Sequence, residues 1–254
     1  MKKVCLIFVL GWICSFESHS QKKNTLDEYN LKGNVVSVHE NTYKAEYRSD
    51  KWEVGEKDWT GHGQSNFDKE GNITELIEFD QNDRILKRHI FKYDKDGFVK
   101  ESITSDSASK LITKQVHVRD SKNRVETVKS YDAKGEPGLA KIIEYNESGK
   151  PIVEKLTDGK GKVFTYHKSK WEGDSIEVQS HYSSSNELEA TIYLGRDKVT
   201  KEITEILILR PDNAIINDIG LCYDFDEKGN WISKLSVDRA GRRSTFTKRR
   251  FVYR

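Results

Sequence analysis

Apolar and polar residues alternate along most of the chain, in segments of about eight or ten residues such as 72–79 and 84–93. Alternation with a period of two residues is typical of β-strands, and segments of this length are too short for helices. Ile, Val, Thr and aromatic residues, which favour strands, occupy many of these positions. The pattern therefore predicts an all-β protein, in which residues 200–209 are the segment that could instead form a short buried helix.

A recurring turn motif separates these segments. It reads Phe67-Asp68-Lys69-Glu70-Gly71-Asn72 and returns, with substitutions, at 93–97, 131–135, 145–149 and 225–230. Asp or Asn at the first turn position can accept a hydrogen bond from the backbone N–H two residues later. The fourth turn position needs a left-handed conformation, so each copy predicts a β-hairpin with a three-residue loop and a bulge. The residues at this fourth position are Gly71, Asp83, Gly97, Asn123, Gly135, Gly149 and Gly161, whereas Ser109 departs from the pattern.

The spacing of the turns predicts how the strands are arranged. From residue 68 to residue 158 the turns begin at alternating intervals of 12 and 14 residues. Because side chains alternate along a strand, even intervals predict that residues of one parity share a face. Uninterrupted hairpins predict a continuous antiparallel meander of about sixteen strands, forming an elongated, twisted single sheet. The aromatic residues expected on one face are Phe67, Phe79, Tyr93, Tyr131, Tyr145, Trp171 and Phe225.

The turn motif resembles the tyrosine-aspartate (YD) repeat of the Rhs and teneurin-like families, over roughly residues 67–251. This resemblance implies a strip of β-hairpins and a place among the small secreted YD-repeat proteins. Large members coil such strips into shells around a toxin, and some copies are described as carbohydrate-binding. The chain is too short for a shell and lacks the paired aspartates of the self-cleaving members. The predicted organisation is a signal peptide at 1–20, irregular strands at 21–57 and a YD-like hairpin domain at 58–254.

The N-terminus has the features of a secretory signal peptide. Lys2 and Lys3 precede an apolar stretch from Val4 to Cys14, and Ser18-His19-Ser20 supplies a motif for cleavage after Ser20. We therefore expect a periplasmic or secreted protein. No apolar stretch reaches the roughly 20 residues of a spanning helix, so no membrane span is expected. Cleavage would leave Cys222 as the single cysteine, which predicts a small buried side chain and no intrachain disulfide.

Composition and charge exclude several classes of protein. The formal net charge is only +2, which provides no excess of Lys and Arg for nucleic-acid binding. Charged residues make up 33% of the chain, against about 25% in an average globular domain. Such a composition argues against the large buried core of a Rossmann or TIM-barrel enzyme.

Residues that could take part in catalysis or metal binding are spread along the chain with the repeat rather than gathered in one region. The histidines have no zinc-binding spacing, and the string Asp94-Lys95-Asp96-Gly97 lacks the preceding ligand of a calcium loop. We therefore predict no enzyme activity, no catalytic residues, no metal and no cofactor. The candidate ligand-binding residues are Trp52, Trp59, Trp171 and Trp231, because sugars stack on exposed rings. The alternative is that the aromatic rings pack against each other along the sheet.

These observations predict an exported, non-enzymatic protein that acts as a binding or scaffold module in the cell envelope. Its partner would be an unknown protein or glycan of the envelope. Two more specific hypotheses remain open at this point, a glycan-binding module and an accessory or immunity-like partner of a secreted toxin.

Overall fold

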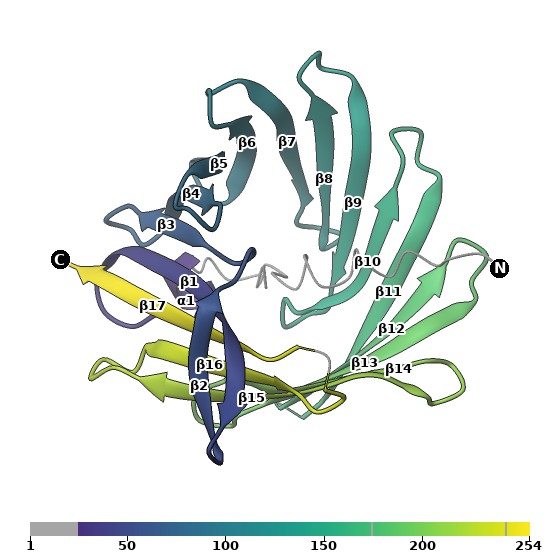
Figure 1. Cartoon of the computed structure of the whole chain (residues 1–254). Coiled ribbons are helices and arrows are strands. Elements are labelled where there is room, and N and C mark those ends of the chain that lie inside the picture. The colour runs from purple at the N-terminus through teal and green to yellow at the C-terminus, as the bar shows by residue number, and fades with distance from the viewer. Residues whose placement is uncertain (1–24, 174, 242) are drawn as a thin grey trace.

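The computed structural model describes residues 25–173, 175–241 and 243–254, and the predicted signal peptide at 1–20 lies outside them. The described residues form one short helix and seventeen strands (Figure 1), so the predicted all-β antiparallel meander is confirmed. No helix in these ranges has the length and apolar character needed to cross a membrane. The elements are α1 (Thr25–Glu28), β1 (Val35–Arg48), β2 (Lys51–Lys57), β3 (Gly63–Phe67), β4 (Ile73–Phe79), β5 (Ile85–Tyr93), β6 (Val99–Asp106), β7 (Leu111–Asp120), β8 (Val125–Asp132), β9 (Pro137–Tyr145), β10 (Pro151–Thr157), β11 (Val163–Glu172), β12 (Ile176–Ser183), β13 (Leu188–Arg196), β14 (Ile203–Leu209), β15 (Ile215–Phe225), β16 (Trp231–Asp238) and β17 (Thr245–Tyr253).

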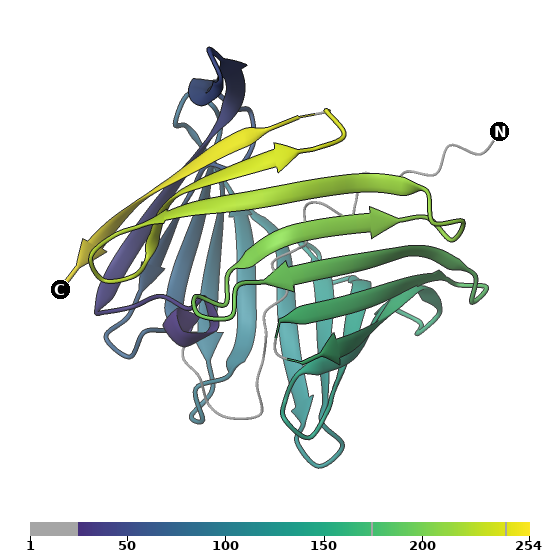
Figure 2. The same cartoon turned by 90° about the horizontal axis from the view of Figure 1, so that it is seen from below.

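The sheet closes into a barrel, and the prediction of an elongated open sheet is wrong (Figures 1 and 2). From β3 to β17 each strand pairs antiparallel with the next. β1 joins the two ends, because Val38 lies opposite Phe251 of β17 and opposite Ser65 of β3. β1, the strand that closes the barrel, contains no turn motif. The periodic pattern of the sequence therefore gave no indication of its partners. Closure pairs the long edges that an open meander would expose.

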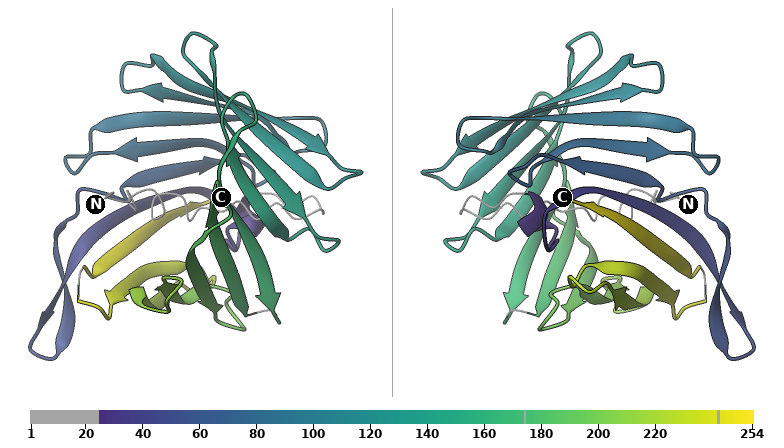
Figure 3. Two further views of the ribbon diagram at one scale, coloured as in Figure 1. Left: turned by 90° about the vertical axis from the view of Figure 1, so that its right-hand side faces the viewer. Right: turned by 90° about the vertical axis from the view of Figure 1, so that its left-hand side faces the viewer.

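The remaining strand, β2, forms a hairpin with the second half of β1. Tyr47 lies opposite Trp52, and Arg48 lies opposite Lys51. β1 is long enough, at 14 residues, to serve both the closed ring and this hairpin. The hairpin extends beyond the barrel wall (Figures 1 and 3).

The predicted turn chemistry is present in the structure. The Asp80 carboxylate accepts a hydrogen bond from the Asn82 N–H at 2.8 Å, and the turns that begin at Asp94, Asp106, Asp132 and Asp158 repeat this bond. The fourth position has a positive φ, for example 84° at Gly71 and 63° at Ser109. Ser109 thus adopts the conformation for which glycine is usually required. In the loop that starts at residue 120, the positive φ falls on Arg124 rather than on the predicted Asn123.

The predicted sharing of one face by the odd-numbered aromatic residues is wrong. A register shift beside most turns adds one residue to one strand, so that even residues lie opposite odd ones, as Ile90 lies opposite Glu75. The aromatic rings are therefore divided between the two faces. Phe67 packs into a buried cluster, whereas Phe79 lies on the outer face with its ring 5.8 Å from that of His39.

The two faces of the barrel wall differ in exposure. Inward-facing side chains such as Val38 and Ile192 are buried, whereas outward-facing side chains such as Leu86 and Phe164 are exposed. This alternation is the one expected of a closed barrel. The strand pairing therefore assigns each side chain to the interior or to the outer wall.

The segment 25–34, which contains α1, crosses one end of the barrel (Figures 1 and 2). The Leu26 N–H donates to the Gly71 carbonyl at 3.0 Å, and the Asn30 amide donates to the Thr200 carbonyl at 2.5 Å. Leu26 also packs against Phe67 in a buried apolar cluster. The segment thus ties together turns from separate parts of the wall.

Tyrosines next to the turns connect neighbouring hairpins at the same end. The Tyr93 hydroxyl donates to the Ile73 carbonyl at 2.7 Å, and the Tyr223 hydroxyl donates to the Ile203 carbonyl at 2.6 Å. Each bond links a strand to the first residue of the strand that precedes it in the chain, β5 to β4 and β15 to β14. These aromatic residues have a structural role in the barrel.

Candidate functional site

The four tryptophans predicted to bind a ligand do not form a common site. Trp231 is buried, and the Arg249 guanidinium lies 3.4 Å from its ring centre. Trp171 has the Lys150 ammonium 4.1 Å from its ring centre. Trp52 packs edge-on against Tyr47, at 5.2 Å between ring centres, on the protruding hairpin. Trp59, in the loop before β3, is the exposed member of the four at 69%.

Charged side chains on the inner face of the barrel are paired with each other. Glu40 accepts a hydrogen bond from Arg249 at 2.8 Å, and Lys141 lies 3.3 Å from Glu154. Glu126 bonds to His117 at 2.9 Å and accepts from the Tyr145 hydroxyl at 3.0 Å. Burial alone would raise the pKa of Glu126, but these hydrogen bonds and nearby positive charges lower it to about 2. Each of these charged groups therefore already has a partner within the wall.

Two inward-facing histidines stack on one another. The rings of His167 and His181 lie 4.8 Å apart and nearly parallel. Burial, together with the neighbouring His167, lowers the pKa of His181 to about 4, and burial also lowers the pKa of His167. Both imidazoles are therefore neutral at pH 7.

On the outer wall, the middle positions of the strands hold charged residues, and most of these residues form ion pairs. Arg88 of β5 lies 2.6 Å from Glu75 of β4, and Lys92 lies 2.9 Å from Glu101. Similar pairs occur further around the wall, such as Lys155 with Glu144 at 2.7 Å. These groups give most of the outer wall a balanced and hydrated surface.

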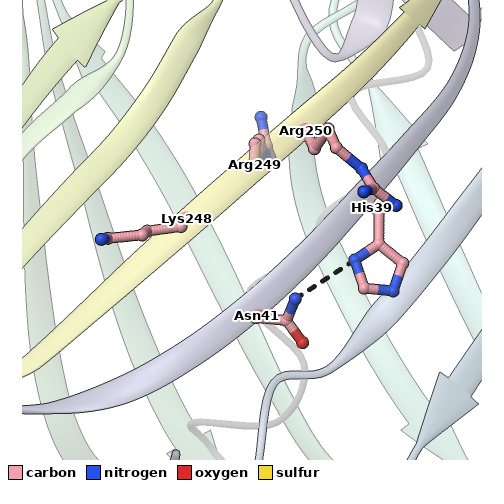
Figure 4. Close-up of a pocket in the computed structure, with 5 residues that line it drawn as sticks. All are labelled: His39, Asn41, Lys248, Arg249 and Arg250. Carbon is pink, nitrogen blue, oxygen red and sulfur yellow. Dashed lines mark hydrogen bonds between the residues drawn. The ribbon is translucent and has the colours of Figure 1, made fainter. Parts of the chain in front are cut away.

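The seam between β1 and β17 is different, because it holds a basic pocket of about 200 Å³ (Figure 4). Asn41 lies opposite Lys248, and His39 lies opposite Arg250, so these four side chains share the outer face. Arg249, which also lines the pocket, turns to the inner face to reach Glu40. Among the described residues, Lys248 and Arg250 have no carboxylate partner, unlike most cations on the same wall.

A chain of polar groups runs from the pocket to the loop between β2 and β3. The Asn41 amide nitrogen lies 3.2 Å from His39 Nδ1, as drawn in Figure 4, and its oxygen lies 3.2 Å from His62 Nδ1. The other ring nitrogen of His62 lies 2.5 Å from the backbone carbonyl of Asp58. Asp58 is fully buried and forms an ion pair with Arg243. Although burial raises the pKa of Asp58, hydrogen bonds from Arg243 and the Thr60 backbone outweigh it and lower the pKa. Asn41 and His39 of the pocket thus adjoin a buried polar cluster that contains His62 and Asp58.

His39 is the titratable group of the pocket. Burial and the positive charge of Arg250 lower its pKa below the usual value. The imidazole is therefore neutral at pH 7 and gains a proton only in more acidic solution or beside an anion.

The described residues contain no group of three or more His, Cys, Asp or Glu side chains arranged to hold a metal ion. Cys222, predicted to be buried, is instead exposed on β15. That prediction is wrong because the position faces outward from the barrel, where small apolar residues are not covered.

The pocket residues do not stand out as a site in the sequence. The run Lys248-Arg249-Arg250 is a visible signal, but its three side chains alternate between the two faces. His39 and Asn41 lie some two hundred residues earlier in the chain, and only the β1–β17 pairing brings them alongside. A single sequence does not specify that pairing.

The sequence matches no protein-family model and no curated protein. Among solved structures it is similar to a porin-like protein from Bacteroides uniformis ATCC 8492, with 10% identity, coverage of 87% of this chain and 98% of that chain, and a TM-score of 0.59. A porin-like protein from Bacteroides vulgatus ATCC 8482 also matches, with 8% identity, coverage of 87% and 99%, and a TM-score of 0.29, which is too low to support an argument. At 10% identity, the first similarity establishes the fold alone.

The identification as a YD-repeat protein, inferred from the turn motif, is wrong. The chain is a closed antiparallel barrel similar to a porin-like protein, and no YD-repeat family model matches it. The motif was misleading for a physical reason. Asp at the first turn position and Gly at the fourth satisfy any three-residue hairpin loop with a bulge. The motif therefore specifies hairpins, not the way in which a series of hairpins is assembled.

Proposed function

We propose that the chain is an exported, non-enzymatic β-barrel that acts as a binding or scaffold module in an aqueous compartment of the cell envelope, either periplasmic or outside the cell. The observation that carries this proposal is the outer wall, which is charged and ion-paired around much of the barrel and holds a basic pocket at the closing seam. The signal peptide predicted at 1–20 supports export.

The residues of the outer wall are better suited to contact with water than to contact with the lipid core of a membrane. A barrel embedded in a membrane carries an outward apolar band about 25 Å tall. Here Glu75, Arg88, Glu101 and Lys114 occupy outward positions on four successive strands. An Arg or Lys facing lipid at the bilayer midplane costs about 2 to 4 kcal/mol. Several such residues on adjacent strands would make insertion unfavourable.

The arrangement of polar groups favours binding at the outer wall over transport through the interior. Inward-facing charges such as Glu40 and Glu126 are already paired with Arg249 and His117. The segment 25–34 crosses one end of the barrel. By contrast, the cations of the outer pocket are available to a ligand.

The similarity to a porin-like protein favours a second candidate function, a pore inserted in the outer membrane. The two candidates differ in solubility and conductance. We expect the chain without its signal peptide to purify as a monodisperse protein without detergent, to stay unbound in flotation with phospholipid vesicles, and to produce no conductance steps in planar bilayers. A detergent-extracted porin analysed in parallel is the positive control. A need for detergent, or stepwise conductance, would favour the pore and refute the aqueous location.

The binding role has its own test. The purified chain is used as bait in an envelope extract, and captured molecules are identified by mass spectrometry. A matched bait has both pocket cations, Lys248 and Arg250, replaced by Gln. We expect a molecule that the native bait captures and the matched bait does not. Equal capture by the two baits would contradict binding at this pocket.

A further inference from the structure

We propose that the pocket between β1 and β17 is a binding site for a phosphoryl group, whose oxygens accept hydrogen bonds from Lys248, Arg250 and His39. This inference rests on the proposed binding function and names the ligand class for it. The site lies on the outer wall, so its occupancy does not depend on access to the barrel interior (Figure 4).

The first support is a local excess of positive charge. Lys248 and Arg250 lie two residues apart on one face of β17 and have no carboxylate partner among the described residues. Nearby, Lys57 and Asp83 form an ion pair and so cancel each other. Arg249 is neutralised on the inner face by Glu40. Two cations therefore remain uncompensated, and a phosphoryl group carries the complementary charge.

The second support is the placement of the donors. Residues two apart on a strand have side chains about 6.5 to 7 Å apart on the same face, and residues directly opposite on the neighbouring strand lie about 4.5 to 5.5 Å away. Lys248 and Arg250 on β17 lie opposite Asn41 and His39 on β1, with the Arg250 guanidinium beside the His39 ring and the Lys248 side chain extending away on the other side (Figure 4). Donors that approach from separate sides suit a tetrahedral oxyanion. A planar carboxylate could use only part of the set.

The third support is the fixed orientation of His39. The Asn41 amide nitrogen lies 3.2 Å from His39 Nδ1. If the Asn41 N–H donates to Nδ1, the proton of the neutral His39 ring must lie on Nε2. The imidazole then presents an N–H donor in place of a lone pair, which is the form that an anion requires.

The pocket volume limits the size of the ligand. About 200 Å³ corresponds to roughly six or seven water molecules at about 30 Å³ each. Pockets for drug-sized ligands hold about 300 to 1,000 Å³. The site therefore accommodates one phosphoryl group, either as free phosphate or as the terminal group of a larger molecule that extends into solvent.

The test is calorimetric titration of the signal-free chain at fixed ionic strength, with inorganic phosphate, glucose 6-phosphate and acetate as probes. We expect saturable binding of one phosphate per chain, and acetate binding at least about tenfold weaker. The double variant K248Q/R250Q should bind phosphate at least about tenfold more weakly, because each lost charge-assisted bond costs roughly that factor. Tight binding of phosphate identifies the free anion as ligand. Preference for glucose 6-phosphate identifies a phosphorylated molecule. Either result supports the site.

A matched control removes equal charge elsewhere on the surface. K129Q/R210Q replaces one exposed Lys and one exposed Arg outside the pocket, and it should bind phosphate as the native chain does. Circular dichroism and the unfolding temperature establish that both double variants are folded. The proposal is overturned if the native chain shows no saturable phosphate binding, or if the pocket variant and the control bind equally well. Neither result bears on solubility or conductance, so it would leave the aqueous location of the barrel intact.

A second measurement isolates His39. Besides the Asn41 amide, the groups that face it are Arg250, Lys57, His62 and Asp83, and burial with the first of these lowers its pKa. A bound anion favours the protonated ring, once the Asn41 amide turns so that its oxygen accepts from Nδ1–H, so affinity should rise as the pH falls from about 8 to about 6. Sulfate is the probe here, because it stays fully ionised across this range. The rise should be absent in H39Q. An equal pH dependence in H39Q would exclude His39 from the site.

Discussion

Glu126 on β8 is expected to control part of the acid stability of the barrel. Its carboxylate has only 12% of its side-chain surface exposed. It bonds to His117 on β7 at 2.9 Å and accepts from the Tyr145 hydroxyl on β9 at 3.0 Å, while the Arg119 guanidinium lies 3.4 Å away. One carboxylate therefore connects three adjacent strands of the wall.

The magnitude follows from the pKa of this carboxyl group. Burial opposes ionisation, but the bond from His117 and the charges of His117 and Arg119 outweigh it, so the pKa falls from 4.5 to about 2. At about 1.4 kcal/mol per pKa unit, the ionised form stabilises the fold by about 3 kcal/mol. Because the folded-state pKa is the lower one, this stability is present above pH 4.5. It is lost as the pH falls from 4.5 to about 2, where the folded protein also takes up the proton.

The perturbation is Glu126→Gln, which keeps the shape of the side chain and removes its charge. Urea unfolding followed by circular dichroism, at several pH values between 7 and 2, measures the free energy of unfolding. We expect E126Q to be about 3 kcal/mol less stable than the native chain at pH 5 to 7, and the difference to shrink toward zero near pH 2. Other carboxylates titrate equally in both proteins and cancel in the difference.

Glu136→Gln provides the matched control, because Glu136 is exposed in the turn after β8. It should leave both the stability at neutral pH and its acid dependence unchanged. The reasoning is refuted if the difference between the native chain and E126Q stays below about 1 kcal/mol at neutral pH, or if it does not change between pH 5 and pH 2.

Four further variants test the turns and the closure of the barrel. Tyr93→Phe removes the hydroxyl that donates to a β4 carbonyl at 2.7 Å, and it should lower the free energy of unfolding by about 1 kcal/mol in urea denaturation. Ser109→Gly should raise the free energy of unfolding by up to about 1 kcal/mol, because Ser109 has a φ of 63°. Gly135→Ala should lower it by a similar amount, because residue 135 has a φ of 85°, although the added Cβ would meet no neighbouring atom. No change in either variant would contradict the assigned φ values. Thr42 and Thr247 lie opposite each other on β1 and β17, so a cysteine pair at these positions, with the other cysteines replaced by serine, should oxidise to a disulfide that raises the unfolding temperature; failure to form it under oxidising conditions would contradict closure.

The parts of the fold that sequence analysis predicted correctly are those with local causes. A turn such as 80–84 contains all the groups that fix it, namely the Asp80 carboxylate, the N–H groups it binds and the left-handed residue Asp83. Strand alternation is equally local, since it depends on side chains within a few residues. The hairpins and the approximate number of strands could therefore be predicted without reference to the rest of the chain.

The incorrect predictions concern properties that depend on distant pairing. The assignment of faces needed the position of each bulge, and a shift of one residue beside a turn moved Phe79 to the outer wall while Phe67 stayed inside. Closure needed the partner of β1, whose sequence has no turn motif to indicate its register. The pocket could not be predicted for the same reason, because its two strands come from opposite ends of the described chain.

The closing seam and the pocket are formed by the same strand pair, so ligand binding and barrel closure must be thermodynamically linked. In an opened barrel, Lys248 and Arg250 would lie on an edge strand without His39 and Asn41 beside them. A ligand that binds the closed form alone stabilises it by about 2.7 kcal/mol at a free concentration one hundred times its dissociation constant. Conversely, a substitution that weakens the β1–β17 pairing must reduce the apparent affinity by the fraction of molecules that remain closed. This coupling follows from the position of the site, and it distinguishes a pocket at the seam from one built within a single hairpin.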